Sequence, residues 1–113
     1  MQKADKLRVA ELLDAAKLIR SYVESADREA FRYDVMRRNA VAGRIIAMAG
    51  LTKRVSEKFK NEHRNIPWHR ISSFGDLMVR APERAHPDEV WEYANFFVPE
   101  LIAMIEAMCS RDD

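Results

Sequence analysis

Apolar residues recur every three or four positions along most of the chain, which is the spacing of amphipathic helices. A first helix is predicted over residues 4–23, with its inward face formed by Leu12, Ala16, Ile19 and Val23. Polar residues suited to helix capping interrupt the pattern at residues 25–27. We expect a short helical turn to follow, through Phe31.

The same spacing predicts a second long helix over residues 34–59. One side of it carries Val41, Ile45, Met48, Thr52, Val55 and Phe59. Ala40, Gly43 and Ala49 are small enough for a neighbouring helix to approach closely, whereas Gly43 and Gly50 weaken an isolated helix. Tertiary packing must therefore hold this helix together, and the polar residues 60–65 are predicted to form a loop.

Prolines punctuate the rest of the chain. Pro67 marks the start of a third helix that continues to about residue 79, because proline is tolerated at the first helical position. Pro82 and Pro87 bracket a predicted loop over residues 81–86, and the last helix begins near Pro87. Pro99 should kink that helix near residues 95–98. The inward positions of the last helix are Trp91, Ala94, Val98, Leu101, Ile105 and Met108.

Composition agrees with an all-helical protein. The chain has 113 residues with only three glycines and four prolines, and no stretch alternates with a period of two. This length suits one domain, residues 1–113. Four principal helices with short connections predict an all-α fold, an antiparallel four- to five-helix bundle.

Several classes of protein and site do not fit the sequence. The single Cys109 cannot form an internal disulfide, so a reducing, cytoplasmic location is expected. The first twenty residues lack the apolar core of a signal peptide, and no apolar run approaches the ~20 residues that span a bilayer. The sequence has neither the paired cysteines nor the His-x-x-x-His spacing that would predict a metal site. No cofactor is expected.

Net charge is only +1, which gives no strong argument for nucleic acid as a ligand. Thirteen of the nineteen basic residues are arginine, whose fork suits phosphate and carboxylate. We interpret these arginines as solvated faces and ion pairs on helices rather than as an RNA-binding patch. Trp68 and Trp91 lie on apolar helical faces, which favours core anchors over platforms for base stacking.

The string Ile66-Pro67-Trp68-His69-Arg70-Ile71, followed by Val90-Trp91 and Pro99-Glu100-Leu101, resembles the C-terminal half of HepT-like (HEPN) proteins. That half typically reads I-P-W-x-x-I, then M-R-N, H-x-Y, V-W and L-P-x-L. The spacing from Ile66 to Trp91 matches it without a gap. Upstream, Asn39-Ala40-Val41 and Lys53-Arg54-Val55-Ser56 resemble the family's D-A-V and K-R-L-S.

The resemblance implies an antiparallel helical bundle that usually forms a homodimer. Active members of the family are ribonucleases, often the toxin half of a toxin–antitoxin pair with a small nucleotidyltransferase. Their chemistry uses an arginine, a polar neighbour, four to six residues and then a histidine. The histidine serves as general acid or base and the arginine holds the phosphate. In some pairs a nearby tyrosine accepts an adenylyl group from the partner, which silences the nuclease.

This sequence departs from the family at every one of those positions. In the gap-free register the family's arginine and asparagine fall on Gly75 and Asp76, and its histidine and tyrosine fall on Arg80 and Pro82. The family's G-E-A on the second helix becomes Ala49-Gly50-Leu51. None of the replacements can perform the original chemistry, because arginine is essentially never deprotonated and glycine has no side chain. The site is therefore predicted to be dismantled.

The spacing of an arginine and a histidine is also met elsewhere, by Arg80 with His86 and by Arg64 with His69. About one such match is expected by chance in a chain with thirteen arginines and three histidines, so the spacing carries little weight. Arg80 and His86 are the better candidates for relocated catalytic residues, since they lie near the family's site in the sequence.

Three hypotheses remain open at this point. The first is a binding protein whose partner is a nucleotidyltransferase-type antitoxin or a related HepT-like chain. The second is a metal-independent ribonuclease toxin that uses Arg80 and His86. The third is a nucleotide- or small-ligand-binding subunit, with RNA as a further candidate ligand. The ligand-binding cleft of such a subunit would lie between helices at the family-site positions. Gly50 and Gly75 would leave space in this cleft if they face each other. These positions are Gly50, Gly75, Asp76, Arg80 and Pro82.

Overall fold

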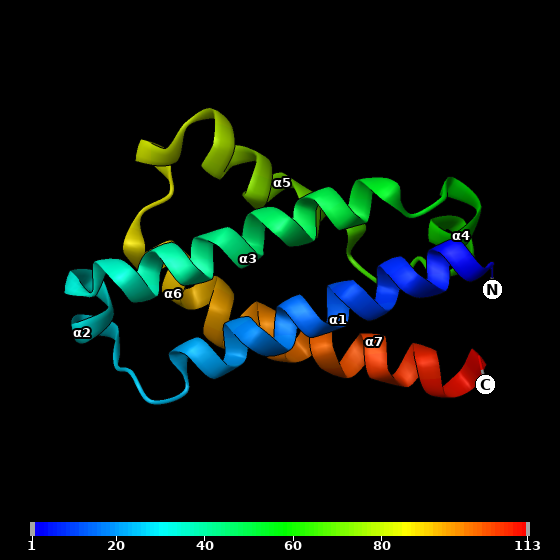
Figure 1. The fold of residues 1–113 in the computed structure, drawn as a ribbon, viewed down its shortest axis with the longest axis horizontal. Coiled ribbons are helices and arrows are strands. Elements are labelled where there is room, and N and C mark those ends of the chain that lie inside the picture. Colours follow the sequence, from blue (N-terminus) through cyan, green and yellow to red (C-terminus); the bar gives the residue numbers. More distant parts are fainter. Residues whose placement is uncertain (1, 113) are drawn as a thin grey trace.

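The computed structural model describes residues 2–112, and the side chains of residues 2–111 within them, as helices joined by short connections (Figure 1). The helices are α1 (Lys3–Val23), α2 (Arg28–Tyr33), α3 (Val35–Arg54), α4 (Glu57–Glu62), α5 (Trp68–Arg80), α6 (Pro87–Glu92) and α7 (Val98–Asp112). A 3₁₀ turn (Pro82–Arg84) and a π segment (Tyr93–Phe97) complete them. The predicted all-α bundle is confirmed, and no strand occurs in the described part of the chain.

The long helices run antiparallel to their neighbours in the bundle. In Figure 1, α3 crosses the molecule between α1 and α5, and α7 lies along α1 on the side away from α5. The two ends of the drawn chain lie at the same end of the bundle (Figure 1). Among the described residues no helix has both the length and the apolar composition that crossing a membrane requires.

The inward faces predicted from periodicity form the core. All four inward residues of α1 are at most 3% exposed, and so are all six residues predicted along one side of the second helix. Burial of each large aliphatic side chain contributes about 1.5–3 kcal/mol. Trp68 and Trp91 are half-buried and pack against the edge of this core. The Trp91 ring lies 5.3 Å from that of Phe31, and the Trp68 Nε1–H donates to the His63 carbonyl at 3.0 Å.

The predicted helix over residues 34–59 is wrong, because the chain forms two helices there. Val55 adopts an extended conformation (φ −74°, ψ 136°) after α3. Ser56 then caps α4, since its hydroxyl accepts a hydrogen bond from the Phe59 amide at 3.2 Å. Asp5 of α1 binds both the amide and the hydroxyl of Ser56, at 2.9 and 2.7 Å, and fixes the break. The predicted loop therefore starts too early, because α4 continues to Glu62.

The other boundaries differ from the predictions by small amounts. Pro67 is the residue before α5 rather than its first residue, and the predicted loop over residues 81–86 contains the 3₁₀ turn. Before Pro99 the chain forms the π segment, in which the Val98 N–H donates to the Tyr93 carbonyl. Pro99 has no amide hydrogen to donate, and the π segment before it changes the regular hydrogen bonding of the α-helix at the place where the kink is predicted.

Two ion pairs connect α2 to α6. Arg32 donates to both carboxylate oxygens of Asp88 at 2.9 Å, and Arg28 lies 3.3 Å from Glu92. The Arg32 guanidinium lowers the pKa of the Asp88 carboxyl below its ordinary value. These pairs hold the α2 corner against the start of α6.

The Asp88 pair should make stability depend on pH. A carboxyl whose pKa is lowered by folding stabilises the protein above its unfolded pKa of about 4, and this contribution is lost as the pH falls through the folded pKa. We expect the urea midpoint of the wild type to fall below about pH 4. Asp88→Asn should have a lower midpoint at neutral pH and a smaller fall. Identical pH profiles for the two proteins, measured by urea titration, would contradict this expectation.

Candidate functional site

A groove of about 660 Å³ runs between α3 and α5, and we call it the α3–α5 groove. From α3 it is lined by Ile46, Ala49, Gly50 and Lys53. From α5 it is lined by residues spaced along one side of the helix: His69, Ser72, Ser73, Gly75, Asp76, Val79 and Arg80. Four of the five family-site positions predicted to form a cleft therefore share this groove, namely Gly50, Gly75, Asp76 and Arg80.

Gly75 is a point of close contact between α5 and α3. A Cβ atom placed on Gly75 would lie 2.5 Å from the Ala49 Cβ and 2.9 Å from the Ile45 carbonyl oxygen. Gly50, by contrast, has nothing within 4 Å of such an atom. The prediction that two facing glycines leave space is therefore wrong for Gly75, which is buried against Ala49. Only Gly50 is open.

Several polar side chains of the groove have partners within the protein. Lys53 forms an ion pair with Asp76 across the groove. The hydroxyls of Ser72 and Ser73 donate to the carbonyls of His69 and Arg70 on their own helix, at 3.1 and 3.5 Å. The partner of Asp76 is therefore a lysine of α3.

The distance between the remaining histidine and arginine limits what the groove can do. His69 lies in the first turn of α5 and Arg80 is its last residue, so they are separated by eleven positions, or about 16 Å of helix. A general base and a phosphate-binding arginine must both reach one phosphodiester, within about 3 Å of its reacting atoms. His69 and Arg80 therefore cannot act together on a single bond in this groove.

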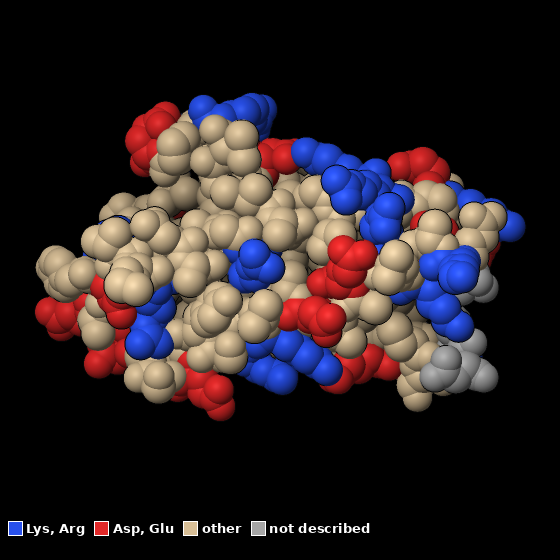
Figure 2. All heavy atoms as spheres, viewed as in Figure 1, with Lys and Arg blue, Asp and Glu red and all other residues tan. Residues whose placement is uncertain are grey.

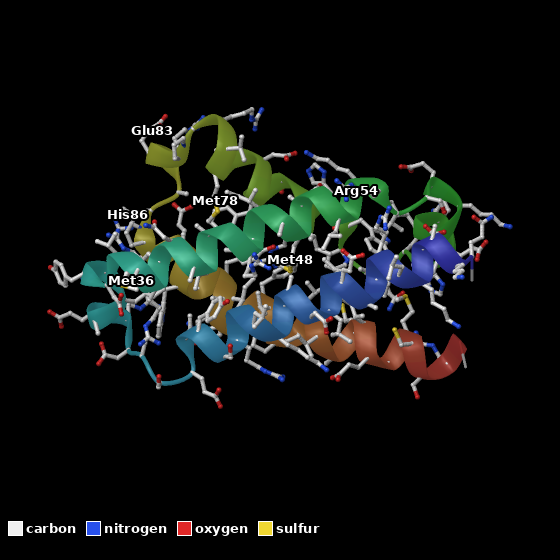
Figure 3. The ribbon with its side chains drawn as sticks, viewed as in Figure 1. Met36, Met48, Arg54, Met78, Glu83 and His86 are labelled. Carbon is white, nitrogen blue, oxygen red and sulfur yellow. The ribbon has the colours of Figure 1, made fainter. Side chains whose placement is uncertain are left out.

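Pro82 and His86 lie elsewhere. They line a second cleft of about 420 Å³, between α3 and the connection from α5 to α6, which we call the Arg38 cleft. Its apolar lining includes Ala42, Ile46, Met78, Ala85 and Val90, and its polar lining is Arg38, Asn39, Glu83 and His86. Figure 3 shows Met78 and His86 on the side of α3 that faces this connection. Glu83 lies farther from α3 than either of them.

The structure therefore separates Arg80 from His86. Arg80 lines the α3–α5 groove, His86 lines the Arg38 cleft, and no hydrogen bond or ion pair joins them within the described chain. The His86 ring has a structural role, because its Nδ1 accepts a hydrogen bond from the Asp88 amide at 3.1 Å and caps α6. The alternative pair is not brought together in the groove either, since His69 lines it and Arg64 does not.

The sequence predictions missed Lys53, His69 and the two serines as groove residues. Helical spacing could have found most of them. Lys53 lies three positions after Gly50, and Ser72 and His69 lie four and seven positions before Asp76. Residues at these spacings share one face of a helix.

Comparison with known families gives a match over almost the whole chain. The family described as ribonuclease HepT-like matches residues 12–108. No solved structure matches the chain.

Proposed function

The chain belongs to the ribonuclease HepT-like family, and we propose that it is a catalytically degenerate member that acts in the cytoplasm by binding a partner protein. The partner we propose is a nucleotidyltransferase-type antitoxin or a second HepT-like chain, in a system of the toxin–antitoxin type. A homodimer is the expected form of the protein itself.

Gly75 is the observation that carries the proposal. It stands at the position of the family's arginine in the gap-free register, and it is a point of close contact between α5 and α3. A side chain at this position would have to displace backbone atoms of α3, because the nearest neighbours are a Cβ, a carbonyl oxygen and a Cα. The position is therefore used for helix packing, which leaves no room for a phosphate-binding group.

The other family positions support the same proposal. Asp76 is engaged by Lys53, and Arg80 has no histidine beside it in the groove. Pro82 stands where the family's tyrosine would be, so this position has no hydroxyl to accept an adenylyl group. We infer that the bundle was kept as a scaffold for binding.

Exposed apolar residues supply a surface for a partner. Ile46 is 37% exposed and Val79 is 63% exposed, and both line the α3–α5 groove. Figure 2 shows a largely uncharged area over the part of α3 that faces the viewer, with charged side chains around it at both ends of the bundle. Uncharged patches rimmed by charge are typical of protein interfaces.

The proposal is tested by incubating purified protein with a mixture of single- and double-stranded RNA. We expect no cleavage above that of a boiled sample, and the same result for His86→Ala. RNA degradation that co-purifies with the protein through two columns and is abolished by His86→Ala would overturn the proposal. Such a result would favour the ribonuclease that uses Arg80 and His86.

A further inference from the structure

The Arg38 cleft has a composition that the proposed degenerate site does not explain. Most of its lining is apolar and includes Ala42, Met78 and Val90. Its polar lining includes one positively charged residue, Arg38. A mainly apolar cleft with a few converging polar groups is the usual form of a binding site.

Arg38 differs from the other arginines at this end of the molecule. Arg28 and Arg32 bind carboxylates on α6, and Arg37 binds both oxygens of the Asp34 carboxylate. Arg38 forms no ion pair with a described residue, and its Nε atom is buried without a hydrogen-bond partner there. A buried donor with no acceptor is costly and rare in folded proteins. The Nε atom itself is covered by the protein, so an acceptor from outside the chain reaches the exposed part of the half-buried Arg38 side chain, which lines the cleft.

The acids near Arg38 do not supply that acceptor. The Asp34 oxygens are taken by the amide and the guanidinium of Arg37, at 3.0 and 3.1 Å. Glu83 lines the same cleft, but no ion pair joins it to Arg38 among the described residues. Glu83 also gives the cleft a negative group, which disfavours a doubly charged phosphate and favours a ligand with a single negative charge.

The shape of the cleft favours a peptide over a small free acid. The cleft is lined mainly by apolar residues, which come from α3, α5, α6 and the connection between α5 and α6. Ile46 lines both this cleft and the α3–α5 groove, so the two hollows adjoin along α3. An extended segment can follow such a trough, placing one apolar side chain in the cleft and others along α3.

We propose that the Arg38 cleft is the docking site for a partner-protein segment that carries an apolar side chain next to an acidic one. The apolar side chain packs on Met78 and Val90, and the carboxylate accepts hydrogen bonds from the Arg38 guanidinium. A fork-shaped guanidinium binds a carboxylate at two points, which sets the orientation of the segment. This inference rests on the proposed function, because it assigns the surface and the chemistry of the partner in that binding role.

The test uses a fluorescein-labelled peptide, Leu-Phe-Asp-Leu with both ends blocked, and its Leu-Phe-Asn-Leu counterpart. We expect the Asp peptide to bind about tenfold more tightly than the Asn peptide, as measured by fluorescence anisotropy. Arg38→Gln should abolish that difference and Arg38→Lys should restore part of it. Arg44→Gln, six residues further along α3 and outside the cleft, should bind like the wild type.

Amide shifts in two-dimensional NMR spectra locate the peptide and show that each variant is folded. Shifts at Ala42, Met78 and Val90 support the proposal. Equal affinities for the two peptides, unchanged binding by Arg38→Gln, or an absence of binding by the folded wild type would overturn it. If 4-phenylbutyrate bound more tightly than the Asp peptide, the occupant of the cleft would be a small free acid and not a protein segment, and the proposal would be wrong. Self-association that Arg38→Gln abolishes, seen by sedimentation, would replace it with a second copy of this chain.

Failure of this experiment is distinguishable from failure of the proposed function. The peptide assay measures binding at the Arg38 cleft and does not depend on whether RNA is cleaved. An RNA-cleaving protein that binds the Asp peptide through Arg38 would overturn the catalytic loss alone. A protein without nuclease activity that ignores both peptides would overturn the docking site alone.

Discussion

Gly75→Ala is expected to lower the free energy of unfolding by about 1–3 kcal/mol, as overpacking a close contact does. The new methyl group would meet the Ala49 Cβ at 2.5 Å and the Ile45 carbonyl oxygen at 2.9 Å, and both are parts of α3 that cannot rotate away. The helices must therefore move apart along their contact. Urea denaturation followed by circular dichroism measures the change.

The two other glycines provide matched controls. Gly43 and Gly50 are exposed on α3, and a Cβ at either position has nothing within 4 Å. Gly43→Ala and Gly50→Ala should raise the free energy of unfolding by up to about 1 kcal/mol, because alanine is the better helix former. Destabilisation of similar size at all three positions would contradict the packing role of Gly75. So would stabilisation at all three.

A second substitution separates the two contacts. Ala49→Gly in the Gly75→Ala background removes the Cβ at 2.5 Å but leaves the Ile45 oxygen at 2.9 Å. We expect this double variant to recover part of the loss, beyond what the sum of the single changes predicts. Additive effects would show that the two residues do not touch in solution.

Gly75 also shows what the gap-free register could and could not predict. The sequence identified the position as one where the family's arginine is missing. It could not show why, because the contact with Ala49 depends on how α5 lies across α3. Periodicity predicts which face of a helix is buried, but the depth of a helix crossing is set by the side chains of both partners.

The same distinction holds for the helices. The buried faces of α1, α3 and α7 were predictable, because each repeats apolar residues with the helical period over several turns. The break at Val55 and Ser56 was not predictable, because the helical spacing of apolar residues continues across it from Val55 to Phe59. The residue that fixes the break, Asp5, lies 51 positions away in the chain. Local patterns carry no information about such a contact.

The candidate site repeats this lesson at closer range. Arg80 and His86 have a catalytic spacing in the sequence, but α5 ends at Arg80 and the chain then turns through Pro82–Arg84. The turn sends the two side chains to different hollows. Spacing along a chain predicts proximity only within one regular element, where the geometry between positions is fixed.

Asp5→Ala is expected to lower the free energy of unfolding by about 2–3 kcal/mol. The variant loses hydrogen bonds to a charged group and leaves a buried donor without an acceptor, and losses of this kind fall in that range. Asp5 is 5% exposed, and its carboxylate accepts hydrogen bonds from the Ser56 amide and hydroxyl. Its removal leaves the amide between α3 and α4 without an acceptor. The measurement is again urea denaturation, with hydrogen exchange at Ser56 and Phe59 as a local readout.

Three further variants show whether this loss comes from the contact itself. Ser56→Ala keeps the backbone bond to Asp5 and loses the hydroxyl bond and the α4 cap, so it should cost about 1–2 kcal/mol. The double variant Asp5→Ala, Ser56→Ala should lose less than the sum, because the two share one interaction. Asp14→Ala, an exposed carboxylate on the same helix, should change stability by less than about 0.5 kcal/mol. If Asp5→Ala resembled Asp14→Ala, the break between α3 and α4 would have to be held by Ser56 capping alone.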